Sequence, residues 1–386
     1  MKLNEICEVY SGYALKEFNE VEDGLPVIKI GNICIDGTLN LEACQYTNEN
    51  VDKKYYSNRG DVYIALSGAT TGKVGIMDIN DTYIINQRVG IVRRKTDDIP
   101  QEYIKYFLLR QNDRIYKEAA GCAQPNISPK QIAEYIVPDI SKDKMHERCT
   151  ILNKIKNIID SRNAEISALD NLIKARFVEM FGCIHDGRFD MKTLLEIVND
   201  DKNSIKRGPF GGALKKEDFV EDGYLVYEQR HAIHNDFEYA KYYINQEKYE
   251  DMIGFKVIPG DLIISCSGVT LGRIAEVPEG AKEGIINQAL LKLSLNPHIM
   301  MNTFFIQQFR GEEIQNILFG FSRGSGIPNM PSMSEVKAVK FICPPLELQK
   351  EYCDFVHQVD KSKVAVQKAL DETKLLFDSL MQKYFG

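Results

Sequence analysis

The sequence lacks features that define several classes of protein. No stretch of 18 apolar residues occurs, and charged residues interrupt the first ten positions, so we expect neither a membrane span nor a secretory signal. The nine cysteines are scattered, odd in number and free of any C-x-x-C pair, which argues against a disulfide framework and a structural zinc site. We therefore expect a cytoplasmic protein with reduced, mostly buried thiols.

Motifs that would indicate catalysis or cofactor binding are also missing. The sequence contains no Asn-Pro-Pro-Tyr or Asp-Pro-Pro-Tyr of an amino-methyltransferase and no helicase motif. Residues 68–73 have three residues between their glycines where a phosphate-binding P-loop has four, and Val74 stands where that loop needs Ser or Thr. No second pair of His or Cys ligands completes a tetrahedral metal site. We expect no catalysis, no metal and no cofactor in this chain.

Length and charge set two further limits. A chain of 386 residues is too long for one hydrophobic core, and two domains of roughly 150 residues are the natural expectation. The net charge of -7 is opposite to that of a simple nucleic-acid binder. Any binding of DNA must therefore depend on local clusters of Lys and Arg.

The chain consists of one unit of about 200 residues that is used twice. Residues 60–73 return as residues 260–273 with seven of fourteen positions identical. Ile-Ile-Asn-Gln at 84–87 and again at 285–288, and Phe-Gly at 181 and again at 385, follow in the same order. Each copy shows short β-type runs, then a helical segment (101–119 and 302–318), then a proline-marked strand, so each copy contains both strands and helix in the same order.

Two long segments, 143–182 and 347–386, close the two copies, and neither contains Gly or Pro before its final glycine. Each has an apolar stripe at alternating steps of three and four, typical of a coiled coil, although one such stripe alone would also fit a core-facing helix. Because the two stripes match, we expect the helices to pair. Because the first globular region leads into the first helix, whose far end leads into the second region and then the second helix, the pair should be antiparallel and form a pseudo-two-fold dumbbell. The apolar positions expected to pair the helices or dock partners are Leu152, Ile155, Ile159, Ile166, Leu169, Ile173, Val356, Val359, Val366, Leu370, Phe377 and Leu380.

The order and duplication of these motifs resemble the specificity subunits of type I restriction-modification enzymes. The shared motifs are a Gly-Asp strand leading into Ser-Gly-x-Thr-x-Gly, an Asn-Gln after a short apolar run, and a long helix entered through a Pro-rich strand. The resemblance implies two α/β target-recognition domains in tandem, joined by a pair of long antiparallel coiled-coil helices. The expected bounds are 1–142 and 183–346 for the recognition domains and 143–182 and 347–386 for the helices.

The resemblance also implies a function and partners. It implies recognition of a two-part, asymmetric site on double-stranded DNA, two docked methyltransferase subunits and motor-nuclease subunits, with S-adenosylmethionine, ATP and Mg on those partners. The alternative is a stand-alone DNA-binding or anti-restriction protein of the same architecture. One departure weakens the alignment of residues 199–216, because the second copy has an extra stretch there.

Candidate DNA-binding residues lie in the repeated turn, in basic clusters and at one strand end. The turn suits a DNA backbone contact but also a purely structural role, and the acid-free run 202–216, with a net charge of +5, is either a backbone contact or a solvated charge run. Arg and Gln can read guanine and adenine edges. The candidates are Ser67, Thr70, Lys73, Arg88, Arg93, Arg94, Lys206, Arg207, Lys215, Lys216, Gln229, Arg230, His231, Ser267, Thr270, Arg273 and Arg323.

Overall fold

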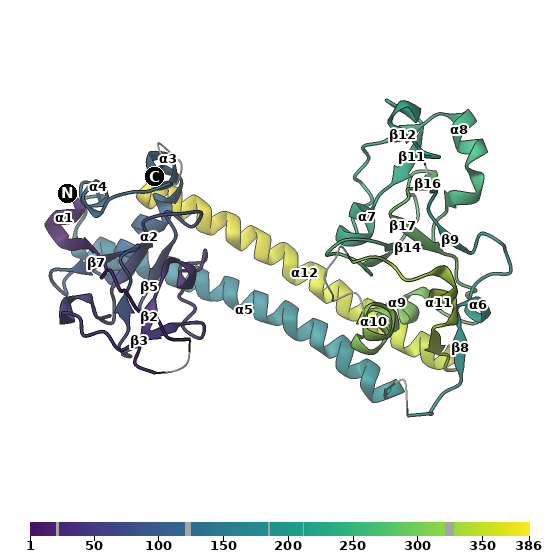
Figure 1. Cartoon of the computed structure of the whole chain (residues 1–386), viewed down its shortest axis with the longest axis horizontal. Coiled ribbons are helices and arrows are strands. Elements are labelled where there is room, and N and C mark those ends of the chain that lie inside the picture. The colour runs from purple at the N-terminus through teal and green to yellow at the C-terminus, as the bar shows by residue number, and fades with distance from the viewer. Residues whose placement is uncertain (21–22, 120–124, 184–185, 211, 321–327) are drawn as a thin grey trace. The chain divides into compact units, whose positions relative to one another are not determined.

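The structure of this chain is a computed structural model that describes residues 1–20, 23–119, 125–183, 186–210, 212–320 and 328–386 (Figure 1). It divides into two compact units. Unit 1 is Met1–Ala164 with Gln367–Gly386, and unit 2 is Glu165–Val366. Each unit therefore contains part of both long helices, α5 (Lys142–Phe181) and α12 (Leu346–Phe385). Both helices begin and end one residue before the bounds expected from the sequence.

Unit 1 is built on an antiparallel sheet in the order β1-β7-β4-β5 and a smaller sheet in the order β3-β2-β6, in which β2 and β6 are parallel. The strands are β1 (Cys7–Ser11), β2 (Leu25–Ile28), β3 (Gln45–Thr47), β4 (Val62–Ala65), β5 (Val74–Ile76), β6 (Ile84–Ile85) and β7 (Val89–Arg94). The helices before α5 are α1 (Leu3–Ile6), α2 (Gln101–Arg110), α3 (Asn112–Ala119) and α4 (Pro129–Ala133), and Ile30–Asn32 and Lys53–Tyr55 are 3-10 turns.

Unit 2 repeats this plan. Its antiparallel sheet has the order β15-β14-β17-β9, its second sheet the order β10-β12-β11-β16-β13 with β11 and β16 parallel, and β18 pairs with β8. The strands are β8 (Met191–Thr193), β9 (Ile205–Arg207), β10 (Phe219–Val220), β11 (Tyr224–Tyr227), β12 (Tyr243–Ile244), β13 (Lys256–Val257), β14 (Leu262–Ser265), β15 (Ile274–Glu276), β16 (Gly284–Ile286), β17 (Leu290–Leu293) and β18 (Lys340–Ile342). The helices are α6 (Leu194–Ile197), α7 (Gln229–His234), α8 (Gln246–Asp251), α9 (Asn302–Arg310), α10 (Glu312–Phe319) and α11 (Met333–Ala338), with 3-10 turns at Lys216–Asp218 and Ile253–Phe255.

The two halves thus share one strand plan, which confirms the mixed α/β repeat. Several expected continuous elements are broken. The apolar run 83–92 forms two strands in different sheets, because the Asn86 side chain accepts a hydrogen bond from the Arg88 backbone N–H and turns the chain. The helical segment 302–318 breaks at Gly311, whose backbone is extended. The expected strand at 136–138 contributes only an isolated bridge between Lys2 and Ile136.

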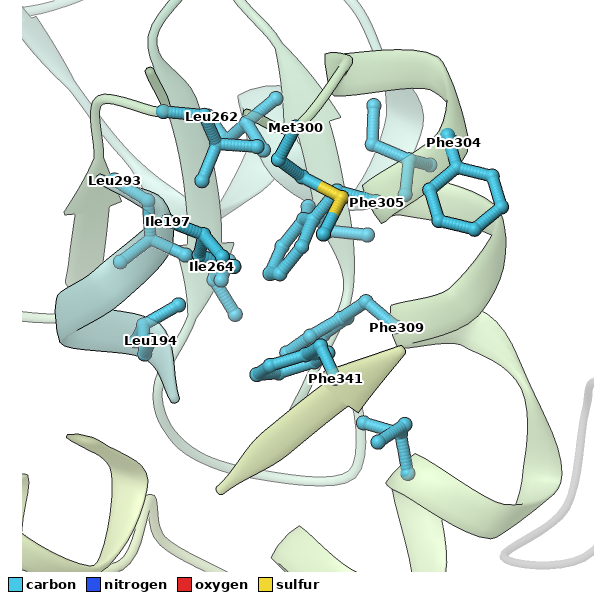
Figure 2. Packing of buried hydrophobic residues seen from close by; sticks show 14 of the residues in the cluster. Leu194, Ile197, Leu262, Ile264, Leu293, Met300, Phe304, Phe305, Phe309 and Phe341 are labelled. Atoms are coloured by element: carbon cyan, nitrogen blue, oxygen red, sulfur yellow. The ribbon is translucent and has the colours of Figure 1, made fainter. Parts of the chain in front are cut away.

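The core of unit 2 lies where β14 and β17 meet α9 and the long helices. Figure 2 shows its inward side chains, with Leu262 and Ile264 from β14 facing Phe305 and Phe309 from α9. Every residue of β14 and β17 is buried, so both faces of these short strands are covered, and buried and exposed positions do not alternate along them. Unit 1 has the equivalent core between β4, α2 and the long helices.

The two long helices pack together within each unit and run antiparallel. In unit 2 the Tyr352 hydroxyl donates to the Ile173 carbonyl, and Arg176 pairs with Glu351. In unit 1 the Arg148 guanidinium donates to the Tyr384 carbonyl over 3.0 Å. None of the twelve apolar residues expected to pair the helices is exposed, whereas most of the positions between them are.

Each long helix ends in a buried aromatic side chain. Phe181, at the end of α5, packs 4.9 Å from Phe304 and 5.5 Å from Tyr352 in unit 2. Phe385, at the end of α12, packs 5.0 Å from Tyr103 in unit 1. Both phenylalanines are nearly inaccessible to solvent. The repeated Phe-Gly of the sequence therefore marks the point where each helix enters the core of a unit.

We predict that Phe181→Ala destabilises unit 2 and that Phe385→Ala destabilises unit 1, each by about 3–5 kcal/mol, because truncation leaves a cavity in a packed core. Native-state hydrogen exchange of the full chain measures both units at once. Phe181→Ala should lower the protection of the β14 and β17 amides more than that of β4 and β7, and Phe385→Ala should do the reverse. Equal loss in both units from either variant would contradict this assignment.

Candidate nucleic-acid interface

The repeated Ser-Gly-x-Thr-x-Gly segment forms the same tight turn in both units. It connects β4 to β5 in unit 1 and β14 to β15 in unit 2. Gly68 and Gly268 have φ values of 82° and 78°, a left-handed backbone that favours glycine. The backbone N–H groups of these two glycines donate to the Pro125 and Pro328 carbonyls, over 3.0 and 2.8 Å. The repeated Pro-Asn thus anchors the turn.

A loop and a strand end meet beside the turn. The loop follows β6 or β16, and its Asn86 or Asn287 side chain accepts from the backbone N–H two residues later. The strand end is Gly12 after β1 and Gly208 after β9, whose N–H groups donate to Val89 and Leu290 at 2.9 and 2.8 Å. A Cβ at Gly12 or Gly208 would overlap the loop backbone, so the strand end and loop are in direct contact. Turn, loop and strand end form one surface.

These contacts settle the uncertain alignment of residues 199–216. Helix α1 begins at Leu3 and α6 at Leu194, an offset of 191 positions, whereas Gly12 corresponds to Gly208, an offset of 196. Part of the extra stretch of the second copy therefore lies between α6 and β9. The end of β11 then corresponds to the end of β2, because Tyr227 and Ile28 accept from the equivalent Asn287 and Asn86 N–H groups. Gln229 of α7 thus occupies the position of Ile30.

This last pair gives the turn different neighbours in the two units. In unit 2 the Gln229 amide donates to the Ser267 hydroxyl over 2.8 Å. In unit 1 Ile30 stands there, and its side chain lies 3.7 Å from where a Cβ on Gly68 would be. Ser67 Oγ and Thr70 Oγ1 are shielded from solvent and find no hydrogen-bond partner among the described residues. The shared turn is therefore surrounded by side chains that differ between the units.

Unit 2 also has a cavity of about 490 Å³ between the turn and the acid-free run 202–216, called the basic segment below. Arg207 lines it together with Phe210, Ser267 and Gln288, and the Arg207 guanidinium lies 5.4 Å from the Phe210 ring centre. Burial raises the pKa of the neighbouring Cys266 thiol to about 12, against the opposing effect of the Arg207 charge, so the thiol is neutral at physiological pH. The cavity combines one cation with amide and hydroxyl groups, which suits a hydrogen-bonding ligand rather than an apolar one.

Comparison with known proteins agrees with this duplicated arrangement. A family model described as the type I restriction modification DNA specificity domain matches residues 1–171 and again residues 209–373. The chain belongs to this family. The type I restriction enzyme MjaVIII specificity subunit of Methanocaldococcus jannaschii is 26% identical over 183 residues, which cover 45% of this chain and 43% of that protein. The matched part of the chain thus spans less than half the length of this curated relative.

Two solved structures share the fold of this specificity-family chain. The S subunit of the type I restriction-modification system from M. genitalium superposes with a TM-score of 0.57 at 16% identity, over 100% of this chain and 95% of the other. A structure that describes complex assembly and conformational transition of a type I R-M system gives 0.59 at 13% identity, over 100% and 96%. These similarities support two tandem α/β domains and paired long helices.

The structure distributes the other predicted DNA-binding residues unevenly. Lys73 and Arg273 lie in the turn, Arg88 is exposed in the loop, and Lys206 lies beside Arg207 on β9. Lys215 and Lys216 are exposed after the glycines of the basic segment. Arg323 lies outside the described residues.

Two predicted residues on β7 have partners within unit 1. Arg93 makes a paired interaction with the buried Asp61 carboxylate at 2.6 and 2.8 Å, and this hydrogen bonding raises the pKa of Arg93. Arg94 pairs with Asp97. Both lie at the end of β7 away from the turn, about 15 Å along a strand that rises roughly 3.3 Å per residue. We therefore leave both outside the candidate interface.

The predicted base readers on α7 also differ from one another. His231 is fully buried, and its ring nitrogens contact the Glu228 backbone and the Tyr239 carbonyl. Asn32 makes the equivalent backbone bond in unit 1, so both residues hold the same bend. Arg230 is exposed but lies 4.3 Å from the Tyr239 ring centre and 3.7 Å from Asp236.

Two further properties hold for the part of the chain that the structure describes. No helix in the described ranges is long and apolar enough to cross a membrane. No group of three His, Cys, Asp or Glu side chains there gathers as a metal site requires.

Sequence reasoning missed the strand end and the Pro-Asn anchor as parts of the site. Gly12 and Gly208 are followed by different residues and sit at a shifted offset, so the repeat alone did not align them. The recurrence of Pro-Asn at 125 and 328 was visible, and a bridge from Asn126 to Ser67 and from Asn329 to Ser267 explains it.

We predict that Gly12→Ala destabilises unit 1 by about 1–3 kcal/mol, a typical cost of overpacking. The added Cβ would meet the Ile85 and Asn86 carbonyl oxygens, whereas at Gly31, the matched control, a Cβ would meet nothing within 4 Å. Urea unfolding, monitored by hydrogen exchange of the β1 and β7 amides, should show a lower midpoint concentration of urea for Gly12→Ala and an unchanged midpoint for Gly31→Ala. Equal midpoints for the two variants would mean that the strand end does not hold the loop.

Proposed function

We propose that this chain is the DNA-specificity subunit of a type I restriction-modification complex, with unit 1 and unit 2 each reading one half of a two-part, asymmetric site on double-stranded DNA. The observation that carries the proposal is one turn surface built twice with the same backbone bonds and different surrounding side chains. A shared framework is expected of two domains that bind DNA in the same way. Different side chains on that framework are expected if the two half-sites differ. Membership of the specificity family supports the same function.

The local charges of unit 2 suit contact with a DNA backbone. The basic segment presents Lys215 and Lys216 to solvent a few residues after the exposed Gly212, which lacks a side chain that would hinder close approach. Lys73 and Arg273 occupy equivalent turn positions, so each unit places a cation beside its turn. Because the net charge of the chain is -7, attraction of phosphates must depend on local cations such as these.

The long helices offer surfaces for protein partners. Outside the paired face, α5 and α12 carry apolar side chains that are exposed in the described chain, and exposed apolar groups on otherwise charged helices mark interaction sites. These are Ile158, Leu172, Val178, Val364, Leu375 and Leu376. We propose that two methyltransferase subunits dock on these helices and that motor-nuclease subunits join the complex. The S-adenosylmethionine, ATP and Mg of the reaction would then belong to those partners, and this chain would recognise DNA without catalysing a step.

Methylation mapping tests the proposed function directly. In the cell that carries this gene, deletion of the gene should abolish methylation at one two-part, asymmetric motif, and reintroduction should restore it. The purified chain alone should methylate no DNA, which serves as the control for catalysis. If every methylated motif persists after deletion, the chain does not direct methylation, and the stand-alone DNA-binding or anti-restriction alternative replaces the proposal.

A further inference from the structure

The equivalence of the two units exposes an exchange of arginine at the candidate interface. Gly12 and Gly208 make the same backbone bond, so the preceding residues, Ser11 and Arg207, are equivalent. By the same logic the residue after the loop glutamine is Arg88 in unit 1 and Ala289 in unit 2, since Leu66 and Cys266 donate to their carbonyls. At this pair of positions, strand end and loop, each unit thus carries one arginine, but on a different backbone element.

In unit 2 the arginine comes from the strand. Arg207 and Ala289 both line the cavity of about 490 Å³, and the small Ala289 side chain occupies little of it. The Nε of Arg207 is shielded from solvent and has no hydrogen-bond partner among the described residues. Gln288 and Asn329 line the same cavity with amide groups. A buried, unpaired guanidinium N–H costs free energy unless a ligand supplies an acceptor.

In unit 1 the arginine comes from the loop. Ser11 replaces the strand arginine, and the Arg88 side chain is exposed with no ion pair or side-chain hydrogen bond to any described residue. Its backbone is nevertheless fixed, because the Asn86 side chain accepts from its N–H at 3.2 Å and its carbonyl accepts from Leu66 at 2.9 Å. A long cation on a rigid backbone can reach a ligand at low cost in backbone order.

We propose that Arg88 and Arg207 are specificity-determining residues, each of which reads a guanine in the half-site of its own unit. The inference rests on the proposed function. A guanidinium fork matches the O6 and N7 acceptors that guanine presents in the major groove, and this paired contact discriminates among bases. The exchange between Ser11 and Arg207, and between Arg88 and Ala289, lets one framework address two sequences.

Other cations near the surface suit a different role. Lys73 and Arg273 are positive at the same turn position in both units, as a contact to the uniform phosphate backbone requires. Arg230 is engaged by Asp236 and Tyr239. Arg88 and Arg207 differ from these cations because the equivalent position in the other unit is not an arginine. Each belongs to the turn surface of its own unit.

The test uses the complete complex and a library of target DNA in which each base of both half-sites is varied. Wild-type complex should require guanine at one position in each half. Arg88→Ala should reduce discrimination at that position of the first half-site by about tenfold or more and leave the second unchanged, and Arg207→Ala should do the reverse. Arg59→Ala, an exposed arginine away from the turn, is the matched control and should change neither half.

A second pair of variants separates base reading from folding. Glutamine pairs with the N7 and N6 groups of adenine, so Arg88→Gln and Arg207→Gln should shift preference from guanine toward adenine at the same positions. Lys215→Ala with Lys216→Ala should instead weaken binding to all sequences alike. Uniform weakening by the arginine variants, or a change in the wrong half-site, would overturn the inference while leaving the proposed function intact. A wild-type complex without sequence preference would overturn both.

Discussion

The structure depends on one constraint, which is that each long helix ends in a core that also contains the start of the other long helix. Phe181 closes α5 against Phe304 and Tyr352, and Phe385 closes α12 against Tyr103. Neither unit can complete its core from one continuous stretch, because each needs the start of one long helix and the end of the other. The strands that lead into the recognition turns pack on these same cores, as Leu262 and Ile264 do in unit 2. Burial at the helix ends therefore also positions the candidate DNA-reading surfaces.

A framework held by backbone bonds can tolerate changes in the side chains around it. In both units the turn, the loop and the strand end are joined through N–H and C=O groups, and the asparagines that brace the loop are the same. The side chains that surround these bonds change freely, from Ile30 to Gln229 and from Arg88 to Ala289. The proposed recognition of two different half-sites then requires no change of fold, only substitution of side chains that take no part in the backbone hydrogen bonds. The framework that the two units share and the side chains in which they differ are consequences of one arrangement.

The sequence predicted the features that depend on local periodicity and on repetition. The heptad stripes marked both long helices to within one residue, and the recurrence of Ser-Gly-x-Thr-x-Gly located the turn. Features that depend on distant pairing were missed. Strands β1 and β9 are short edge strands whose partners lie some 80 residues away, and the changing offset concealed their equivalence. Arg93 looked like a surface cation because its partner, the buried Asp61, is 32 residues distant.

If the proposed function is right, the two units are copies of one DNA-reading domain, and each reads its own half-site. A hybrid chain in which residues 193–345 replace residues 2–141 tests it, because equivalent positions are joined at both ends and the long helices are retained. Methylation mapping of the complex assembled with this hybrid measures the motif directly. Because α5 and α12 run antiparallel, we expect a motif that contains the unit 2 half-site twice, in opposite orientations. An assembled, active hybrid that still methylates the original asymmetric motif would contradict it.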